Sequence, residues 1–219
     1  MSKELWTQVD RYIEEVAIPP DAALDAALAA SATAGLPAIA VSPAQGKFLH
    51  LLAKMIAARR ILEIGTLGGY SAIWMARALL PGGKLVTLEI DAKHAAVARR
   101  SLEGAGVASI VDLRLGAALE TLPKLAHESP FDLVFIDADK QHNAEYFDWS
   151  VKLTRAGGVI VVDNVVRDGK VLDSTTDDAV IQGVRRFNDA LRNDRRVDAT
   201  TLQLVGVKGY DGMTLAVRL

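Results

Sequence analysis

The sequence of 219 residues contains no cysteine, few aromatic residues and no excess of charge of one sign. Without cysteine, disulfide bonds, thiolate metal sites and thiol catalysis are excluded. Lysine and arginine number 25 against 27 aspartates and glutamates, which gives a net charge of −2. No basic tail or stripe is visible. Nucleic acid is therefore not expected as a partner, although a folded surface can still gather a local basic patch.

Long hydrophobic runs are also absent. A membrane-spanning helix needs about 20 consecutive apolar residues, and no run in this sequence is that long. The first residues, from Met1 to Trp6, contain no apolar signal core. The sequence therefore predicts a soluble cytoplasmic protein with no membrane partner.

The residues that are present suit one compact domain, since half of them are hydrophobic and domains usually span about 50–250 residues. Apolar residues at helical spacing predict helices over residues 5–18, 21–34 and 42–58. We therefore expect a single domain over residues 1–219, with N-terminal helices in 1–58 and a core in 59–219.

From Arg60 onward, short apolar strands alternate with helices. The predicted strands are 60–64, 84–89, 110–115, 131–136 and 158–162, and the predicted helices between them are 70–80, 92–105, 117–126 and 143–154. This alternation is typical of an α/β fold with a doubly wound, Rossmann-like, mostly parallel sheet. After a helix over 177–192, two last strands over 199–205 and 213–218 predict an antiparallel addition at one edge.

The end of the first strand predicts a cofactor site, because ligands in such sheets bind beyond the carboxyl ends of the strands. Residues 63–71 read Glu-Ile-Gly-Thr-Leu-Gly-Gly-Tyr-Ser. The glycine spacing is G-x-x-G-G rather than the G-x-G-x-x-G of dinucleotide binders. Glu63 would repel a pyrophosphate but would attract the ammonium and sulfonium of S-adenosylmethionine (SAM). The pattern therefore favours SAM over NAD.

The ends of the next two strands are consistent with a nucleoside. Glu89 follows the second strand, where a carboxylate can accept both hydroxyls of a ribose. Small residues after the third strand, Gly116 to Ala118, would let an adenine ring lie against the backbone. The alternative interpretation is that these glycines form ordinary turns and the glutamates are solvated.

Three oxygen-bearing side chains follow the fourth and fifth strands and predict a metal site. Asp137 ends one strand, and Asp163 and Asn164 end the other. Oxygen ligands select Mg²⁺, Mn²⁺ or Ca²⁺ rather than zinc. Two neighbouring carboxylates repel each other unless a cation lies between them. The alternative is that these residues only end strands and cap the following helices.

Four sequence runs, SPAQGKFLHLL, LEIGTLGGYSA, FDLVFIDADK and VVDNVV, resemble the caffeoyl-CoA and catechol O-methyltransferase family. The resemblance extends from about Val41 to the end of the chain, with the motifs in order at the expected strand ends. It implies a methyl-transfer enzyme that uses SAM and a divalent metal ion, and it favours a homodimer.

The resemblance also implies roles for individual residues. Asp137, Asp163 and Asn164 would bind Mg²⁺ or a similar ion, and Asp137 would also lie near the substrate. Lys140 resembles the family's general base, which would act on an acceptor hydroxyl held at the metal. Asp168 stands where some relatives touch substrate, in a context that departs from the plant pattern. The residues implied to line the SAM pocket are Val41, Glu63, Gly65, Thr66, Ser71, Glu89, Ala118, Asp137 and Asp139.

The acceptor stays open at this point. We expect a small phenolic compound of the catechol or hydroxycinnamoyl type, and the alternative is hydroxylated uridine in tRNA, methylated by the same site. An NAD-dependent oxidoreductase and a SAM-binding module without catalysis are further alternatives.

Overall fold

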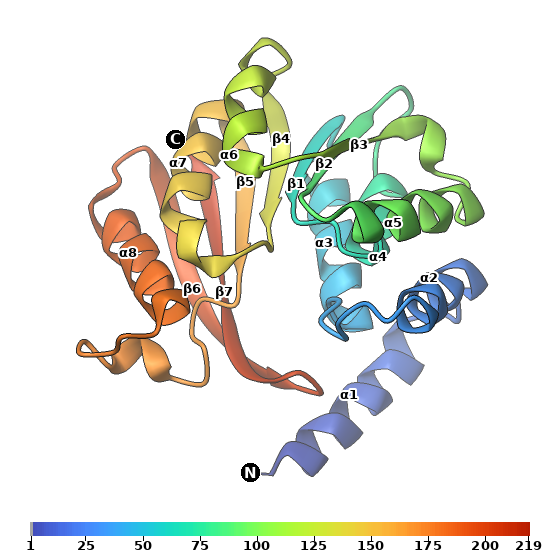
Figure 1. Cartoon of the computed structure of the whole chain (residues 1–219), viewed down its shortest axis with the longest axis horizontal. Coiled ribbons are helices and arrows are strands. Elements are labelled where there is room, and N and C mark those ends of the chain that lie inside the picture. Colours follow the sequence, from blue (N-terminus) through green and yellow to red (C-terminus); the bar gives the residue numbers. More distant parts are fainter. Residues whose placement is uncertain (1) are drawn as a thin grey trace.

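The computed structural model describes residues 2–219 and has a seven-stranded sheet at its centre. The strand order across the sheet is β3-β2-β1-β4-β5-β7-β6 (Figure 1). The strands in chain order are β1 (Arg60–Ile64), β2 (Lys84–Glu89), β3 (Val111–Leu115), β4 (Phe131–Ile136), β5 (Thr154–Asp163), β6 (Val197–Gly206) and β7 (Gly209–Arg218). Strands β1 to β5 pair in parallel, whereas β7 pairs antiparallel with β5 and β6.

Helices cover both faces of this sheet. The helices are α1 (Lys3–Ala17), α2 (Ala22–Thr33), α3 (Pro43–Met55), α4 (Tyr70–Ala76), α5 (Ala92–Gly104), α6 (Ala118–Thr121), α7 (Asn143–Leu153) and α8 (Ala179–Asn193). Figure 1 shows α3, α4 and α5 on one side of the strands and α6, α7 and α8 on the other. This arrangement confirms the predicted doubly wound α/β class.

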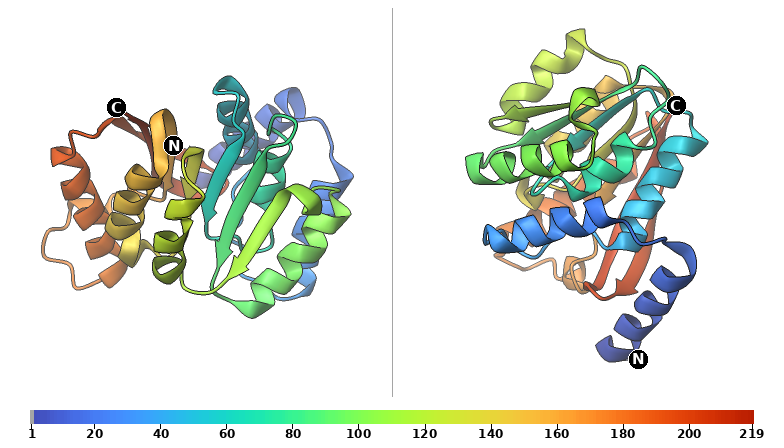
Figure 2. Two further views of the ribbon diagram at one scale, coloured as in Figure 1. Left: turned by 90° about the horizontal axis from the view of Figure 1, so that it is seen from above. Right: turned by 90° about the vertical axis from the view of Figure 1, so that its right-hand side faces the viewer.

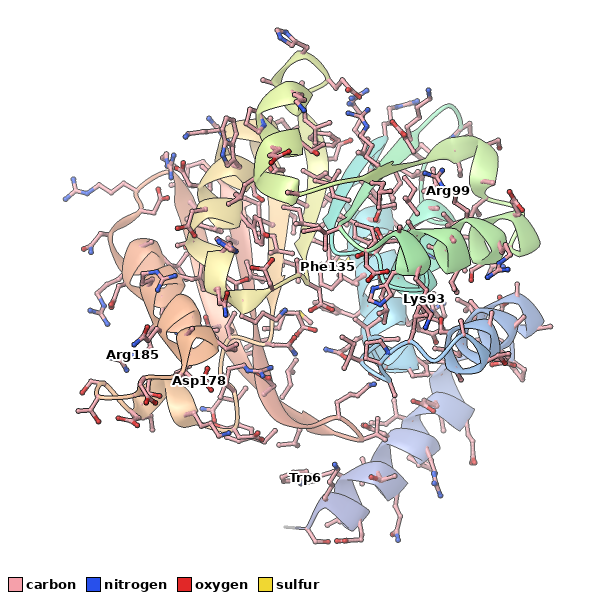
Figure 3. All side chains as sticks on the ribbon, viewed as in Figure 1. Trp6, Lys93, Arg99, Phe135, Asp178 and Arg185 are labelled. Carbon is pink, nitrogen blue, oxygen red and sulfur yellow. The ribbon has the colours of Figure 1, made fainter. Side chains whose placement is uncertain are left out.

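Alternating strand residues supply the two halves of the core. In β4, Phe135 packs into the cluster that includes α3 and α4, whereas its neighbour Val134 packs into the cluster that includes α7 and α8. Both side chains are almost completely buried, and Figure 3 shows Phe135 near the middle of the molecule. Burial on both faces explains why the parallel strands read as continuous apolar runs.

Several predicted helices are shorter in the structure, for local reasons. The helix predicted over 42–58 ends at Met55, and Ala57 then adopts a left-handed conformation with φ of 51°. The helix predicted over 117–126 is α-helical only to Thr121 and continues as a 3₁₀ turn that contains Pro123. Proline has no backbone N–H to donate to a longer α-helix.

Helix α1 extends away from the sheet, as the right-hand view of Figure 2 shows. None of its described residues is buried, and Figure 3 places Trp6 well outside the main body. Asp10 of α1 accepts a hydrogen bond of 2.6 Å from the backbone N–H of Val207, at the tip of the β6–β7 hairpin. Within residues 2–219, no helix combines the length and apolar character needed to cross a membrane.

Candidate active site

The strand order reverses between β1 and β4, and the residues that follow these strands form the centre of the site. The chain leaves β1 toward β2 and β3 and then returns to β4, which pairs with the other side of β1. In open α/β sheets, ligands bind in the crevice beyond the carboxyl ends at such a switch point. The strand ends highlighted by the sequence therefore meet at this edge of the sheet.

Gly65 allows the turn after β1 to approach the end of β4. Its φ is 98°, a conformation that residues with a side chain rarely adopt. A Cβ atom at this position would also collide with the carbonyl group of Asp137. Glycine is therefore required here, because it brings the turn after β1 against the residue expected to bind metal.

Glu63 lies beneath this turn and is completely buried. Its carboxylate accepts hydrogen bonds from the hydroxyl groups of Ser71, at 2.5 Å, and Thr87, at 2.6 Å. Burial raises the pKa of Glu63 to about 8. Both oxygens of Glu63 are thus engaged with other side chains, and Ser71 is oriented by one of them.

Glu89 closes the same turn from the end of β2. Its Oε2 atom accepts hydrogen bonds from the backbone N–H groups of Leu67, at 2.8 Å, and Thr66, at 3.3 Å. Its Oε1 atom accepts a hydrogen bond of 2.9 Å from Asp91 N–H. A carboxylate has about four acceptor positions, so Glu89 retains little capacity beyond the three bonds that stabilise the turn.

Asp139 follows β4 and is oriented by two aromatic residues. Tyr146 donates a hydrogen bond of 2.6 Å from its hydroxyl to Oδ1, and the His142 ring is hydrogen-bonded to Oδ2. Asp139 itself is exposed. Ala118 begins α6 after β3, beyond the end of a neighbouring strand.

A cavity of about 570 Å³ lies beside these strand ends. Five predicted site residues line it: Val41, Asp137, Asp163, Asn164 and Asp168. The other predicted residues, Glu63, Gly65, Thr66, Ser71, Glu89, Ala118, Asp139 and Lys140, are not part of this lining. The structure thus brings the predicted metal ligands together in one cavity and leaves most of the predicted SAM residues around the adjacent turns.

The donor set in the cavity fits a hard cation. Asp163 is buried, and burial, followed by the negative charge of Asp137, raises its pKa above the usual range. Neighbouring Asn164 has a left-handed backbone, with φ of 59°, and its N–H donates to Asp163 Oδ1 at 2.8 Å. A cation between Asp137 and Asp163 would relieve their repulsion. No cluster of three or more His, Cys, Asp or Glu residues suited to a metal occurs in residues 2–219, so a cation held by these two aspartates would need Asn164 as a third protein ligand.

Lys140 provides a positive charge next to these acids. Its side chain is buried, and its Nζ atom donates a hydrogen bond of 2.6 Å to Asp137 Oδ1. The two residues lie on either side of the short segment that follows β4, three positions apart. This contact places an amine next to the acidic end of the cavity.

Some residues of the site were not predicted. Gln45 donates a hydrogen bond of 3.4 Å to Asp163 Oδ2, but in the sequence it is recognisable only as part of a helix-capping pattern. Tyr146 and Thr87 contact predicted site residues from other elements. No sequence signal identifies such partners, because the contacts exist only once the sheet has formed.

A doubly wound sheet with an acidic cavity beside its switch point is the arrangement in which α/β proteins bind small molecules. Comparisons with known proteins are more specific. A family model described as O-methyltransferase matches residues 20–219. A catechol O-methyltransferase from Niastella koreensis is 54% identical over 219 residues, covering 99% of each chain.

Solved structures agree with this comparison. An O-methyltransferase from Bacillus cereus, in complex with SAH, has a TM-score of 0.97 and 52% identity over 100% of both chains. The O-methyltransferase TomG from Streptomyces achromogenes, involved in tomaymycin synthesis and in complex with SAM, has a TM-score of 0.96 and 51% identity, covering 100% of this chain and 99% of that one. The chain belongs to the O-methyltransferase family, and the alternative of an NAD-dependent oxidoreductase is therefore wrong.

Proposed function

We propose that this enzyme transfers a methyl group from SAM to a hydroxyl group of a small catechol-like or hydroxycinnamoyl-like acceptor, with the help of a divalent metal ion. The observation that carries the proposal is the meeting of Asp137, Asp163 and Asn164 in one cavity, with Lys140 paired to Asp137. The relative named catechol O-methyltransferase and the neighbours described with SAH and SAM support the same chemistry.

The turn after β1 is the proposed SAM site. Gly65 and Thr66 would offer backbone at close range, Ser71 would offer a hydroxyl held by Glu63, and Glu89 would bind the ribose with the acceptor capacity that its three backbone bonds leave. Asp139, held by Tyr146, and Ala118, the first residue of α6, would line the same SAM pocket. Val41 would close the methionine end from the cavity side. Glu63 then acts mainly by orienting Ser71.

Asp137, Asp163 and Asn164 would hold the metal, which we expect to be Mg²⁺, with Mn²⁺ or Ca²⁺ as alternatives. When bound, the cation supplies Lewis acidity, which lowers the pKa of a coordinated hydroxyl. Gln45 steadies Asp163 through its side-chain amide. The donor set leaves room for two adjacent hydroxyls of a catechol.

Lys140 is the proposed general base. Lys140 must first lose its own proton, which a bound cation nearby would favour. The neutral amine would then accept the proton of the attacking hydroxyl, while the oxygen–methyl bond forms and the sulfur–methyl bond breaks. The base contributes about 10²–10⁴-fold to the rate when it is positioned in this way. Through its hydrogen bond, Asp137 would hold the amine of Lys140 beside the acceptor cavity, which Asp137 itself lines, and holding the reacting atoms in line would supply much of the remaining acceleration.

The test is methyl transfer from SAM to catechol and caffeic acid, with Mg²⁺ and after thorough chelation. We expect turnover that chelation abolishes and added Mg²⁺ restores. Asp163→Ala should abolish turnover and spare SAM binding, whereas Asp198→Ala, on the exposed edge strand β6, should be unaffected. Full activity after chelation would disprove the metal role, and SAM binding without turnover on any phenol would favour a binding module.

We also propose that the protein acts as a homodimer through α1. This helix exposes apolar side chains along one face, including Val9, Tyr12 and Val16, which are 46%, 67% and 68% exposed. A contiguous apolar face of this kind marks an interaction site. A second copy of the chain would cover it with its own α1.

The tRNA acceptor gains no support from the cavity. Its lining contains two basic side chains, Arg167 and Lys208, and Arg167 lies 3.5 Å from Asp211. Binding of RNA relies on an extended basic surface that neutralises phosphates. A small phenolic acceptor is therefore the better match to the site.

A further inference from the structure

The cavity has two chemically different ends. Asp137, Asp163 and Asn164 form the acidic inner end at the sheet, described above. The outer end is formed by the loop around residues 38–41, the start of α3 and the β6–β7 hairpin. Apolar side chains on these outer elements include Ile39, Phe48, Leu202, Leu204 and Val205.

Such a lining suits an aromatic ring and a short carbon chain. An acceptor whose hydroxyl groups lie at the acidic end would extend its ring substituent toward the hairpin. The group at the far end of that substituent would therefore meet the residues of the hairpin tip.

Lys208 lies at this tip and lines the cavity. Its Nζ atom donates a hydrogen bond of 3.1 Å to the carbonyl oxygen of Ala38, which joins the hairpin to the opposite loop. Among the ion pairs of residues 2–219 there is none that involves Lys208, whereas the other basic residue of the lining, Arg167, is paired with Asp211. Lys208 is thus a cation with unused hydrogen-bonding capacity, since an ammonium has three donors.

The unpaired ammonium of Lys208 favours a negatively charged ligand at this point of a lining that is otherwise rich in aspartate. Partial burial lowers the pKa of this lysine, and the charge of Asp137 opposes that effect. The residue is exposed, but its ammonium has no ion-pair partner within residues 2–219, so an added anion would be stabilised there. Asp10, the acid of α1 in the lining, already accepts a hydrogen bond from Val207 N–H.

We propose that Lys208 binds an acidic substituent of the acceptor, so that the preferred substrates are catechols with a short side chain ending in a carboxylate. This inference rests on the function proposed above and adds the substrate class. Asp168 also lines the cavity, and like Lys208 it is exposed, so it offers an opposite charge to the same ligand. A preference for cationic catechols is the competing outcome.

The experiment compares caffeate with its methyl ester, which has the same catechol ring and tether without the charge, and includes dopamine as the cationic acceptor. Initial rates are measured with SAM and Mg²⁺ for the wild type, Lys208→Met, Lys208→Arg and a control, Lys84→Met. Lys84 is the first residue of β2, so it lies at the amino ends of the parallel strands, away from the cavity, and it is exposed.

We expect the wild type to prefer caffeate over methyl caffeate. Lys208→Met should lower kcat/KM for caffeate by about 10-fold or more, mainly through KM, since a hydrogen bond to a charged group contributes about 1.5–3 kcal/mol. The value for methyl caffeate should stay the same, Lys208→Arg should retain the preference, and Lys84→Met should match the wild type.

Two results would overturn the inference. Equal losses for caffeate and its ester in Lys208→Met would mean that Lys208 only ties the hairpin to Ala38. A wild-type preference for dopamine over caffeate would assign the outer end to Asp168 instead. If no catechol is methylated at all, the proposed function fails and this inference fails with it, so the two failures are distinguishable.

Discussion

Nζ of Lys140 lies 2.6 Å from Oδ1 of Asp137, and both residues follow strand β4 at the edge where the cavity opens. The proposed base and a proposed metal ligand therefore contact each other directly. One carboxylate oxygen of Asp137 accepts a hydrogen bond from the amine, and the other accepts no side-chain hydrogen bond within residues 2–219. This contact would let one short segment combine the proposed metal binding with the proposed proton transfer.

Replacing Lys140 tests its role as the base. We expect Lys140→Met to lower kcat by about 10²–10⁴-fold while the Kd for SAM stays close to that of the wild type. Stopped-assay rates and calorimetric SAM titration measure the two quantities. Thermal unfolding of the same variant provides the control for folding, because Lys140 is buried and its removal leaves Asp137 without its ion-pair partner. A variant that folds and retains full kcat would contradict the assignment.

Glu63 should make the stability of the ligand-free protein depend on pH. Its pKa is raised from 4.5 to about 8 by burial, so the folded protein holds a proton between these values that the unfolded chain releases. Stability from this group is therefore present below pH 4.5 and is lost as the pH rises toward 8, by at most about 1.4 kcal/mol per pH unit.

Glu63→Gln isolates this contribution, because glutamine has a similar shape and does not titrate. We expect the difference in unfolding free energy between the wild type and Glu63→Gln to change in favour of the variant as the pH rises from 5 to 8. Chemical denaturation at several pH values, with chelator present, measures it. Parallel pH profiles for the two proteins would show that Glu63 is already ionised in the folded state.

Much of the fold could be predicted from the sequence, because buried parallel strands carry continuous apolar runs. Residues 131–136, for example, form β4 with the predicted bounds. The position of the last strand could not be predicted: β7 lies between β5 and β6, which depends on pairing across the sheet rather than on local pattern. Helix ends were less certain where a left-handed residue such as Ala57 stops the helix.

The candidate site was predictable where residues follow strand ends. Asp137 and Asp163 lie at the carboxyl ends of neighbouring strands, and that topology alone brings them to one edge. Long-range partners were not predictable. Gln45 reaches Asp163 across 118 positions of sequence, and Lys208 reaches the cavity only because the β6–β7 hairpin folds over it.

The apolar face of α1 should control the oligomeric state. We expect Tyr12→Glu to shift the protein from dimer to monomer, because a charge at a 67% exposed apolar position is compatible with water but not with a buried interface. Light scattering after size-exclusion chromatography measures the mass. Glu15→Ala, also exposed on α1, is the control and should remain dimeric. A wild type that stays monomeric at high concentration would disprove the homodimer.

Gly183 of α8 allows the helix to pack directly on the segment that carries Lys140. A Cβ atom at this position would collide with the carbonyl group of Lys140 and with Cα of Gln141. Arg186, one turn later, donates a hydrogen bond of 2.7 Å to the carbonyl of Gln141 and ties the same two elements together. The backbone beneath Lys140 is therefore positioned by α8.

We expect Gly183→Ala to displace this segment, with a loss of about 1–3 kcal/mol of stability from overpacking. Displacement of Lys140 should also lower kcat by up to about 10²-fold, since misplacement of a reacting group by 1 Å has effects of that size. Gly104→Ala is the matched control: Gly104 ends α5, and a Cβ atom there would meet nothing within 4 Å. That change should leave kcat unaltered and add about 0.5–1 kcal/mol of stability. Unfolding and rate measurements on both variants decide the matter, and a Gly183→Ala protein with wild-type kcat would show that α8 supports the fold without positioning the base.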